Sequence, residues 1–481
     1  MRVPTKRLNK SPWKERVNFL SEDSTVTIIE HIDYLATMDD AQTEWQNGYI
    51  VIQNGVIQAV GTGTPDVGTA TATRISGRGC IATPGLINTH HHLFQKVTRV
   101  LVAAQNVRLI EWKRANFHYW SFIDEEAVYV TALVALSELA LSGCSLSSDL
   151  LYVFPVDVNG TVRFMQSAVA AAHDVGMRFQ PTRGGVDFSL DTGGAPPDRM
   201  MESTDDVLLG MERAIQQFHD PSPGSMCRVG IAPNSLTMCT PRLWMESRDL
   251  AKKYGVTRHT HVAEFVEELE YFQETMGMRL IARLAELGWI ESDVWLAHVV
   301  HASSAEIDLL AANGTGVSHC PSSNMRLGSG IAPVRDMLDR GVCVGIGVDG
   351  SASNDGGNLL GEARLAMLLS RVSRRDRLTT AREVLRMATV GGAQILGRTD
   401  VGRIQVGMQA DIALYEPYGV SAAGTEHDPI AALVLAWPPR VKHLMVQGRF
   451  VVENGALVHQ NETDLRQRHQ SVVKKLQAQL Q

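Results

Sequence analysis

The chain has 481 residues, of which 44% are hydrophobic and 20% charged, and its formal net charge is −7. This is ordinary globular composition for one large domain or two to three smaller ones, and it excludes a disordered chain and a basic nucleic-acid-binding surface. No stretch approaches 18 uninterrupted apolar residues, so we expect no membrane segment. The six cysteines form no Cys-x-x-Cys pair, and a chain with a large core needs no disulfides. We therefore expect reduced thiols and a cytoplasmic protein.

The two ends of the chain share a strand-like pattern. Near the N-terminus, Asn54-Gly55 lies between apolar alternations, which is typical of a β-hairpin. A similar strand-like pattern occurs near the C-terminus, so the two ends are expected to fold together. We predict five parts in chain order: a flexible arm (1–22), the N-terminal part of a small β-sandwich (23–83), a barrel (84–400), the C-terminal part of the sandwich (401–460) and a C-terminal helix (461–481).

The middle of the chain alternates short apolar runs with longer helical stretches. Eight runs follow one another: IATPGLINTH, SLSSDLL, RFQPTRG, RVGIAPNS, VTRHTHVAE, VWLAHVV, TGVSHCPSSN and VCVGIGVDG. Alternating strands and helices indicate a parallel sheet, and eight such units favour a closed barrel. The pattern predicts an α/β fold, a (β/α)8 TIM-like barrel, in which functional residues lie at the carboxyl ends of the strands.

Polar residues follow four of these runs directly. His90 and His92 lie two positions apart and so point to the same side, where two imidazoles form a natural metal pair. His261 and His298 end two later runs. Asp349 closes a strongly apolar run, where a buried carboxylate is costly unless it is paired or bound to metal. Each residue alone has an ordinary structural explanation, but the five together, at the ends of four runs, indicate a metal centre.

These motifs resemble a known family. PGLINTHHH, HTHVAE, LAH and GVDGSASN are similar to the amidohydrolase superfamily, and more narrowly to its aminohydrolase branch, with its 8-oxoguanine deaminases and triazine hydrolases. The resemblance extends over about residues 81–398. It implies four metal ligands: His90, His92, His261 and Asp349. It also implies that Glu264 is a proton shuttle and that His298 orients the nucleophile or polarises the scissile group, while Asp349 accepts a proton from water.

The spacing of lysines bears on the number of metal ions. Many relatives hold two metals bridged by a carboxylated lysine, but here no lysine occurs between Lys113 and Lys252, the region that covers strands two to four of the barrel. We therefore expect one divalent ion per chain. Three neutral imidazoles and a carboxylate suit Zn²⁺, with Fe²⁺ or Co²⁺ as alternatives.

Four further residues are predicted to contact the substrate: Gln95, Leu150, Arg183 and His319. Arg183 has a second interpretation, a structural salt bridge. Leu150 stands where the 8-oxoguanine deaminases carry histidine, so a pocket-facing Leu150 would indicate a less polar substrate. A leucine that packs outward under a helix is the alternative.

We expect a metal-dependent hydrolase of a non-peptide C–N bond that acts on a small molecule. The first hypothesis is hydrolytic deamination of a nitrogen heterocycle, either an oxopurine, a pyrimidinone or a hydroxytriazine. The alternative is hydrolysis of a more apolar urea, carbamate or thiocarbamate, such as a phenylurea. A non-catalytic barrel is disfavoured because all six proposed metal and catalytic residues are present. We expect a homo-oligomer, a dimer or higher.

Overall fold

The structure is a computed structural model that describes residues 26–65, 72–154, 158–189, 196–417, 420–436 and 440–480. The arm predicted for residues 1–22 lies outside the described residues. In the described part of the chain, no helix is long and apolar enough to cross a membrane.

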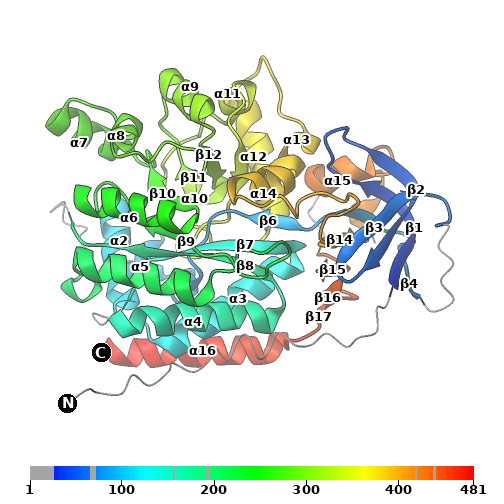
Figure 1. Cartoon of the computed structure of the whole chain (residues 1–481), viewed down its shortest axis with the longest axis horizontal. Helices are drawn as coiled ribbons and strands as arrows, with labels where there is room; N and C mark the ends of the chain where they lie inside the picture. The colour runs from blue at the N-terminus through cyan, green and yellow to red at the C-terminus, as the bar shows by residue number, and fades with distance from the viewer. Residues whose placement is uncertain are drawn as a thin grey trace.

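Eight parallel strands form a closed barrel at the centre of the molecule (Figure 1). They are β6 (Leu86–Asn88), β7 (Cys144–Leu151), β8 (Arg178–Gly185), β9 (Gly230–Pro233), β10 (Arg258–Val262), β11 (Val294–His298), β12 (Gly316–His319) and β13 (Val344–Ile346). Each of the eight apolar runs in the sequence supplies one of these strands, and β13 pairs with β6 to close the ring. The prediction of a (β/α)8 barrel is confirmed.

Helices cover the barrel on its outer side (Figure 1). They are α2 (Leu109–Trp120), α3 (Glu125–Leu141), α4 (Val158–Val175), α5 (Thr204–Phe218), α6 (Pro241–Tyr254), α7 (Val266–Met276), α8 (Leu280–Glu286), α9 (Ser304–Asn313), α10 (Pro321–Arg326), α11 (Val334–Asp339), α12 (Leu359–Ser373), α13 (Ala381–Arg386) and α14 (Gly392–Ile395). Local sequence sets their ends. Helix α6, for example, begins after Thr240, whose hydroxyl accepts from the Leu243 N–H, and stops at Gly255, whose φ of 65° suits glycine.

The two ends of the chain form one sheet beside the barrel (Figure 1). Its strands are β1 (Val26–Ala36), β2 (Glu44–Gln53), β3 (Val56–Thr62), β4 (Thr73–Ser76), β5 (Ile81–Pro84), β14 (Ile412–Tyr415), β15 (His443–Val446), β16 (Arg449–Glu453) and β17 (Ala456–Leu457). Strand β14 pairs antiparallel with β5 and so joins the N- and C-terminal parts. Both parts contribute side chains to a separate small core, including Ile29, Ile52 and Ile412. The prediction that the two ends fold together is confirmed.

The last helix, α16 (Glu462–Gln479), runs along the outside of the barrel and packs against α3 (Figure 1). Most of its residues are polar, and its three buried residues, Leu465, Val472 and Leu476, lie seven and four positions apart and so face the barrel together. The short helix α15 (Pro429–Leu435) packs against α12 and α13. The carboxyl ends of the barrel strands remain open on one side, where the polar residues gather.

Candidate active site

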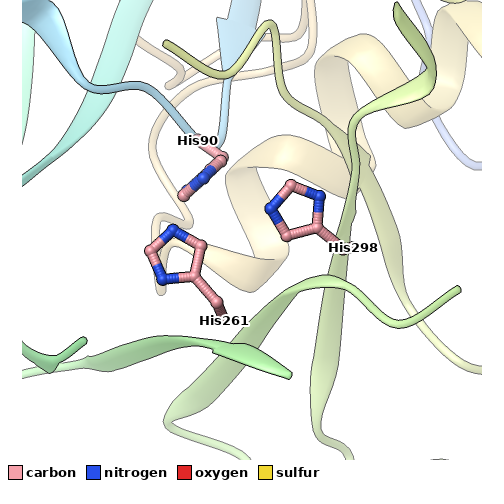
Figure 2. Close-up of side chains that lie close together, drawn as sticks. All are labelled: His90, His261 and His298. Carbon is pink, nitrogen blue, oxygen red and sulfur yellow. The ribbon is translucent and has the colours of Figure 1, made fainter. Parts of the chain in front are cut away.

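Five side chains from four strand ends converge inside the barrel mouth. His90 and His92 follow β6, His261 lies in β10, His298 ends β11, and Asp349 follows β13. In Figure 2 the rings of His90, His261 and His298 turn toward one another. The Asp349 Oδ1 atom lies 3.3 Å from His90 Nε2 and 3.5 Å from His92 Nε2, and His92 Nε2 lies 3.0 Å from His261 Nε2. These contacts join the four predicted ligands in one cluster.

Hydrogen bonds at the outer nitrogens fix the tautomers of these rings. His92 Nδ1 lies 2.8 Å from the Leu150 carbonyl and His261 Nδ1 lies 2.8 Å from the Asn234 carbonyl. A carbonyl oxygen only accepts, so both Nδ1 atoms carry the proton. Burial holds the pKa of both rings below its usual range, that of His92 at about 3, so each ring is neutral and its Nε2 is a bare lone pair.

His259 fixes the third ring in the same way. Its Nδ1 lies 2.8 Å from the Trp295 carbonyl, to which it must donate, and burial holds the pKa of His259 well below its usual range. Its Nε2 is therefore an acceptor, and it lies 2.7 Å from His90 Nδ1. His90 must donate through Nδ1, which leaves its own Nε2 as a lone pair that points into the cluster.

This donor set fits a divalent cation. Three imidazole lone pairs and a carboxylate oxygen lie in this cluster. His92 Nε2 and His261 Nε2 are 3.0 Å apart, and the tautomers set by the two carbonyls leave no proton between them. His90 Nε2 is buried and has no hydrogen-bond partner in the described part of the chain. Facing lone pairs repel unless a positive charge sits between them, and neutral imidazoles with a carboxylate are the ligands that transition metals prefer.

The carboxylate of Asp349 is held in place and ionised. Its Oδ1 accepts from the Gly350 N–H at 2.6 Å, and its Oδ2 accepts from the Ser353 hydroxyl at 3.0 Å. Burial by itself would raise the pKa of Asp349, but its interactions with the His90 ring, 3.3 Å away, and with the His298 ring, 3.9 Å away, hold that pKa well below the usual range. Asp349 adopts a φ of 63°, a left-handed backbone that is unusual for a non-glycine residue.

Glu264 and His298 stand beside this cluster. Glu264 Oε2 lies 3.7 Å from His298 Nε2, and Asp349 Oδ2 lies 3.9 Å from the same nitrogen. Burial raises the pKa of Glu264 to about 7, against the opposing effect of His298. Burial lowers the pKa of His298, but Glu264 and Asp349 outweigh it, so the net shift is upward. A carboxyl group with a pKa of about 7 and an imidazole with a raised pKa therefore face the donor cluster.

These two positions rest on an unusual backbone. Ala263, which precedes Glu264, has a φ of 50°, and His298 has a φ of 71°. The Asn324 Oδ1 atom, from α10, accepts from His298 Nδ1 at 2.9 Å and orients the ring. Non-glycine residues in left-handed conformations cost on the order of 1–3 kcal/mol each and persist where the surrounding structure holds them, often at functional sites.

A cavity with an empty volume of about 590 Å³, part of which opens to solvent, leads to this cluster. Polar and apolar residues line it: His92, Gln95, Leu109, Trp112, Lys113, Phe117, Tyr152, Asn234, Ser235, Met238, His261, Glu264, Phe265, Glu268, His298, Leu327, Asp349 and Ser353. Gln95 is 2% exposed, and its Oε1 has no partner among the described residues, so its amide oxygen is available to a ligand. A Cβ on Gly350 would lie 1.9 Å from that oxygen, so only glycine leaves room for it.

Three of the four residues predicted to contact the substrate do not line the cavity. Arg183 is fully buried outside the cavity lining, where it pairs with Glu202 at 2.5 Å and donates to the Thr161 hydroxyl at 2.9 Å. The prediction of a substrate contact is corrected in favour of a structural ion pair, because strand alternation turns this side chain outward toward α4 and α5.

Leu150 and His319 also do not line the cavity. The Leu150 side chain is 0% exposed within the main hydrophobic core, and only its carbonyl serves the site, by accepting from His92. The idea that Leu150 makes the pocket less polar is therefore corrected. His319 is 1% exposed behind the site, where burial and the charge of His298 lower its pKa to about 3.

Sequence reasoning missed several residues of the site. His259 was visible in the HTH motif, but its role depends on Trp295, which lies 36 positions away along the chain. The spacing of Leu109, Trp112 and Phe117 marks one face of a helix, yet no local signal shows that this face meets the cavity.

A metal-dependent hydrolase built on a (β/α)8 barrel is the class that this fold and donor set define. The amidohydrolase family model matches residues 81–451, and the chain belongs to this family. It is 34% identical to an 8-oxoguanine deaminase of Pseudomonas aeruginosa, over 89% of this chain and 95% of that protein. It is also 34% identical to the hydroxydechloroatrazine ethylaminohydrolase of Pseudomonas sp. (strain ADP), over 92% of this chain and 94% of that protein.

A solved structure of a related enzyme supports the same family assignment. The atrazine chlorohydrolase of Arthrobacter aurescens TC1, complexed with zinc, superposes with a TM-score of 0.88 at 32% identity and covers 93% of this chain and 100% of its own. The predicted membership of the amidohydrolase superfamily and of its aminohydrolase branch, and the prediction of an enzyme, are confirmed.

Proposed function

We propose that this protein is a metal-dependent aminohydrolase that deaminates a nitrogen heterocycle, namely an oxopurine, a pyrimidinone or a hydroxytriazine. The observation that carries the proposal is that Glu264, with a pKa of about 7, faces both the imidazole–carboxylate cluster and the cavity. Relatives that deaminate 8-oxoguanine and isoxanthopterin, at 34% and 35% identity, support the substrate class.

We propose one divalent ion, zinc first, held by His90, His92, His261 and Asp349. Zinc is supported by the zinc-complexed chlorohydrolase structure, and Fe²⁺ or Co²⁺ suit the same donors. When bound, such an ion lowers the pKa of a coordinated water to about 7, so that a hydrolytic nucleophile is available at neutral pH.

The residues of the chain then move the protons. Asp349 is ionised and accepts the proton that the attacking water loses, and His298 stands close enough to orient that water. Glu264 donates a proton to a ring nitrogen of the substrate. It then takes the proton that the new hydroxyl group loses as the carbonyl forms, and passes it to the amine, which departs as ammonia. Transfer of the remaining proton from Asp349 to Glu264 restores both groups. Gln95 and Asn234 line the same cavity and orient the ring through their amides.

The test is a product screen. Purified protein loaded with one equivalent of zinc should release ammonia from at least one heterocyclic amine of the three classes. The Glu264→Gln variant, which keeps the shape of the side chain, serves as the inactive control. If the wild-type protein releases no ammonia from any of these compounds, the proposal is wrong.

A second candidate, hydrolysis of an N-aryl urea, carbamate or thiocarbamate, is favoured by one observation. Six cavity-lining side chains are apolar: Leu109, Trp112, Phe117, Met238, Phe265 and Leu327. An oxopurine has polar edges that such a wall leaves unpaired, at about 1–3 kcal/mol for each group. Release of an aromatic amine from an N-phenylurea, without ammonia release from any heterocycle, would establish this alternative.

We further propose a homo-oligomer that works in the cytoplasm on a small molecule. Exposed apolar residues gather before and at the start of α2, where Val100, Val102 and Ile110 are 55%, 83% and 38% exposed, and such a surface suits a second copy of the chain. All six cysteines are free thiols, which suits a reducing compartment. Light scattering of the purified protein tests the first point.

A further inference from the structure

Helix α2 presents one face to the cavity. Leu109, Trp112, Lys113 and Phe117 all line the cavity and lie three, four and eight positions apart, which is the spacing that places side chains on one side of a helix. Ile110, the next residue after Leu109, is 38% exposed and is not among the lining residues. The orientation of α2 is therefore well defined relative to the site.

Apolar side chains from three other segments, Met238, Phe265 and Leu327, also line the cavity. Together with the α2 face they are called the apolar wall below. Met238 follows β9, Phe265 is the residue before α7, and Leu327 is the residue after α10. Phe117, Phe265 and Met238 are 3%, 6% and 7% exposed, so little of their surface remains in contact with water. Apolar groups from four separate segments therefore line the same cavity as the imidazole cluster.

A hydrogen bond and two aromatic contacts hold α2, the main part of this wall, in place. Trp112 Nε1 donates to the Ala352 carbonyl at 3.0 Å, in the loop that follows Asp349, so α2 is tied to the catalytic loop. The Trp120 ring contacts Trp112 and Phe117 edge to face, with centroids 5.7 Å and 5.5 Å apart. A preorganised apolar surface loses little conformational freedom when it binds a ligand.

Beside its apolar side chains, the cavity lining also holds Lys113 and Glu268. Burial raises the pKa of Glu268, and Lys113 opposes that shift. The apolar part of the lining is the part that suits a hydrocarbon group of a ligand.

We propose that this face of α2, together with Phe265, forms an apolar subsite for a neutral alkyl or aryl substituent of the substrate. The inference rests on the proposed function, because it uses the same cavity, and it narrows the substrate class to molecules that carry such a substituent. Apolar groups that fill a hydrophobic pocket change kcat/KM by about 10–200-fold for each methylene.

Two pairs of compounds test the subsite. The first pair is a diamino-hydroxytriazine and the same ring with one N-isopropyl group, and the second is N-methylurea and N-phenylurea. Turnover is measured with zinc-loaded wild-type protein, and binding is measured by calorimetry with zinc-loaded Glu264→Gln protein. Each measurement is repeated with Leu109→Gln and with Ile110→Gln, a matched control on the adjacent but outward-facing position of the same helix.

In at least one pair, we expect the compound with the larger apolar group, N-isopropyl or N-phenyl, to have a kcat/KM at least about tenfold higher than the other member. Its binding should also show a more negative heat-capacity change. Leu109→Gln should reduce that preference at least about fivefold, because it weakens binding and turnover of the N-isopropyl or N-phenyl compound only. Ile110→Gln should leave the preference unchanged. The subsite is refuted by equal binding of both members, by an equal loss for both in Leu109→Gln, or by no binding of either pair. If only the ureas are hydrolysed with the expected preference, the subsite stands and the proposed deamination fails.

Discussion

Replacing His259 with phenylalanine removes the group that holds His90 in its metal-binding tautomer. Phenylalanine keeps the stack on Trp295, whose ring centroid lies 4.4 Å from that of His259 at an interplanar angle of 11°. It removes the Nε2 atom that lies 2.7 Å from His90 Nδ1. The His90 Nδ1–H then has no acceptor, or the proton moves to Nε2 and blocks the lone pair that faces the cluster.

The expected loss follows from that geometry. A buried donor without a partner costs about 1–3 kcal/mol, and 1.4 kcal/mol corresponds to a tenfold change in an equilibrium constant, so zinc affinity should fall about 5- to 150-fold. Outer partners of metal-binding histidines typically contribute 10–100-fold, in the same range. The assay is competition between the protein and a chromophoric chelator for zinc.

His443→Phe is the matched control, because His443 is also buried, at 6% exposed, and contacts an aromatic ring, Phe450, but lies in the terminal sheet. It should bind zinc as the wild-type protein does. Urea unfolding of each variant without metal separates a change in affinity from a loss of folding. A His259→Phe protein that is folded and binds zinc within about twofold of the control would show that His259 does not fix the tautomer of His90.

The remaining predictions concern catalysis and stability. Glu264→Gln should retain zinc but lose about 10²–10⁴-fold in turnover, the usual contribution of a general acid–base group; near-normal kcat would show that the shuttle lies elsewhere. Because the proton donor must be protonated and burial raises the pKa of Glu264 to about 7, kcat/KM should fall as pH rises through about 7, and a flat profile up to pH 9 would contradict this. Elemental analysis should return one metal ion per chain, and Asp349→Asn should lose both metal affinity and turnover; two ions, both needed for activity, would overturn this. Arg183→Ala should destabilise the fold by about 3–5 kcal/mol in urea unfolding, because it leaves Glu202 unpaired, while substrate preference among folded molecules stays the same.

The sequence by itself determined the barrel and the nature of its centre. Eight apolar runs separated by helical stretches indicate a parallel sheet, and closure of that sheet into a barrel leaves no strand with an unpaired edge. A residue that ends a parallel strand must lie at the same edge as its counterparts. The order of His90, His92, His261, His298 and Asp349 along the chain therefore already placed them together.

Tertiary structure alone decided what each buried side chain touches. Leu150 and Arg183 both belong to strand ends, where a substrate contact was a reasonable prediction, yet the barrel turns one into the hydrophobic core and the other toward Glu202. Conversely, α2 lies outside the barrel strands, and only its packing against the catalytic loop through Trp112 and Ala352 brings its apolar face to the cavity. Strand order follows from local periodicity, whereas the direction of a side chain depends on the twist of the closed barrel and on contacts between segments that are hundreds of residues apart.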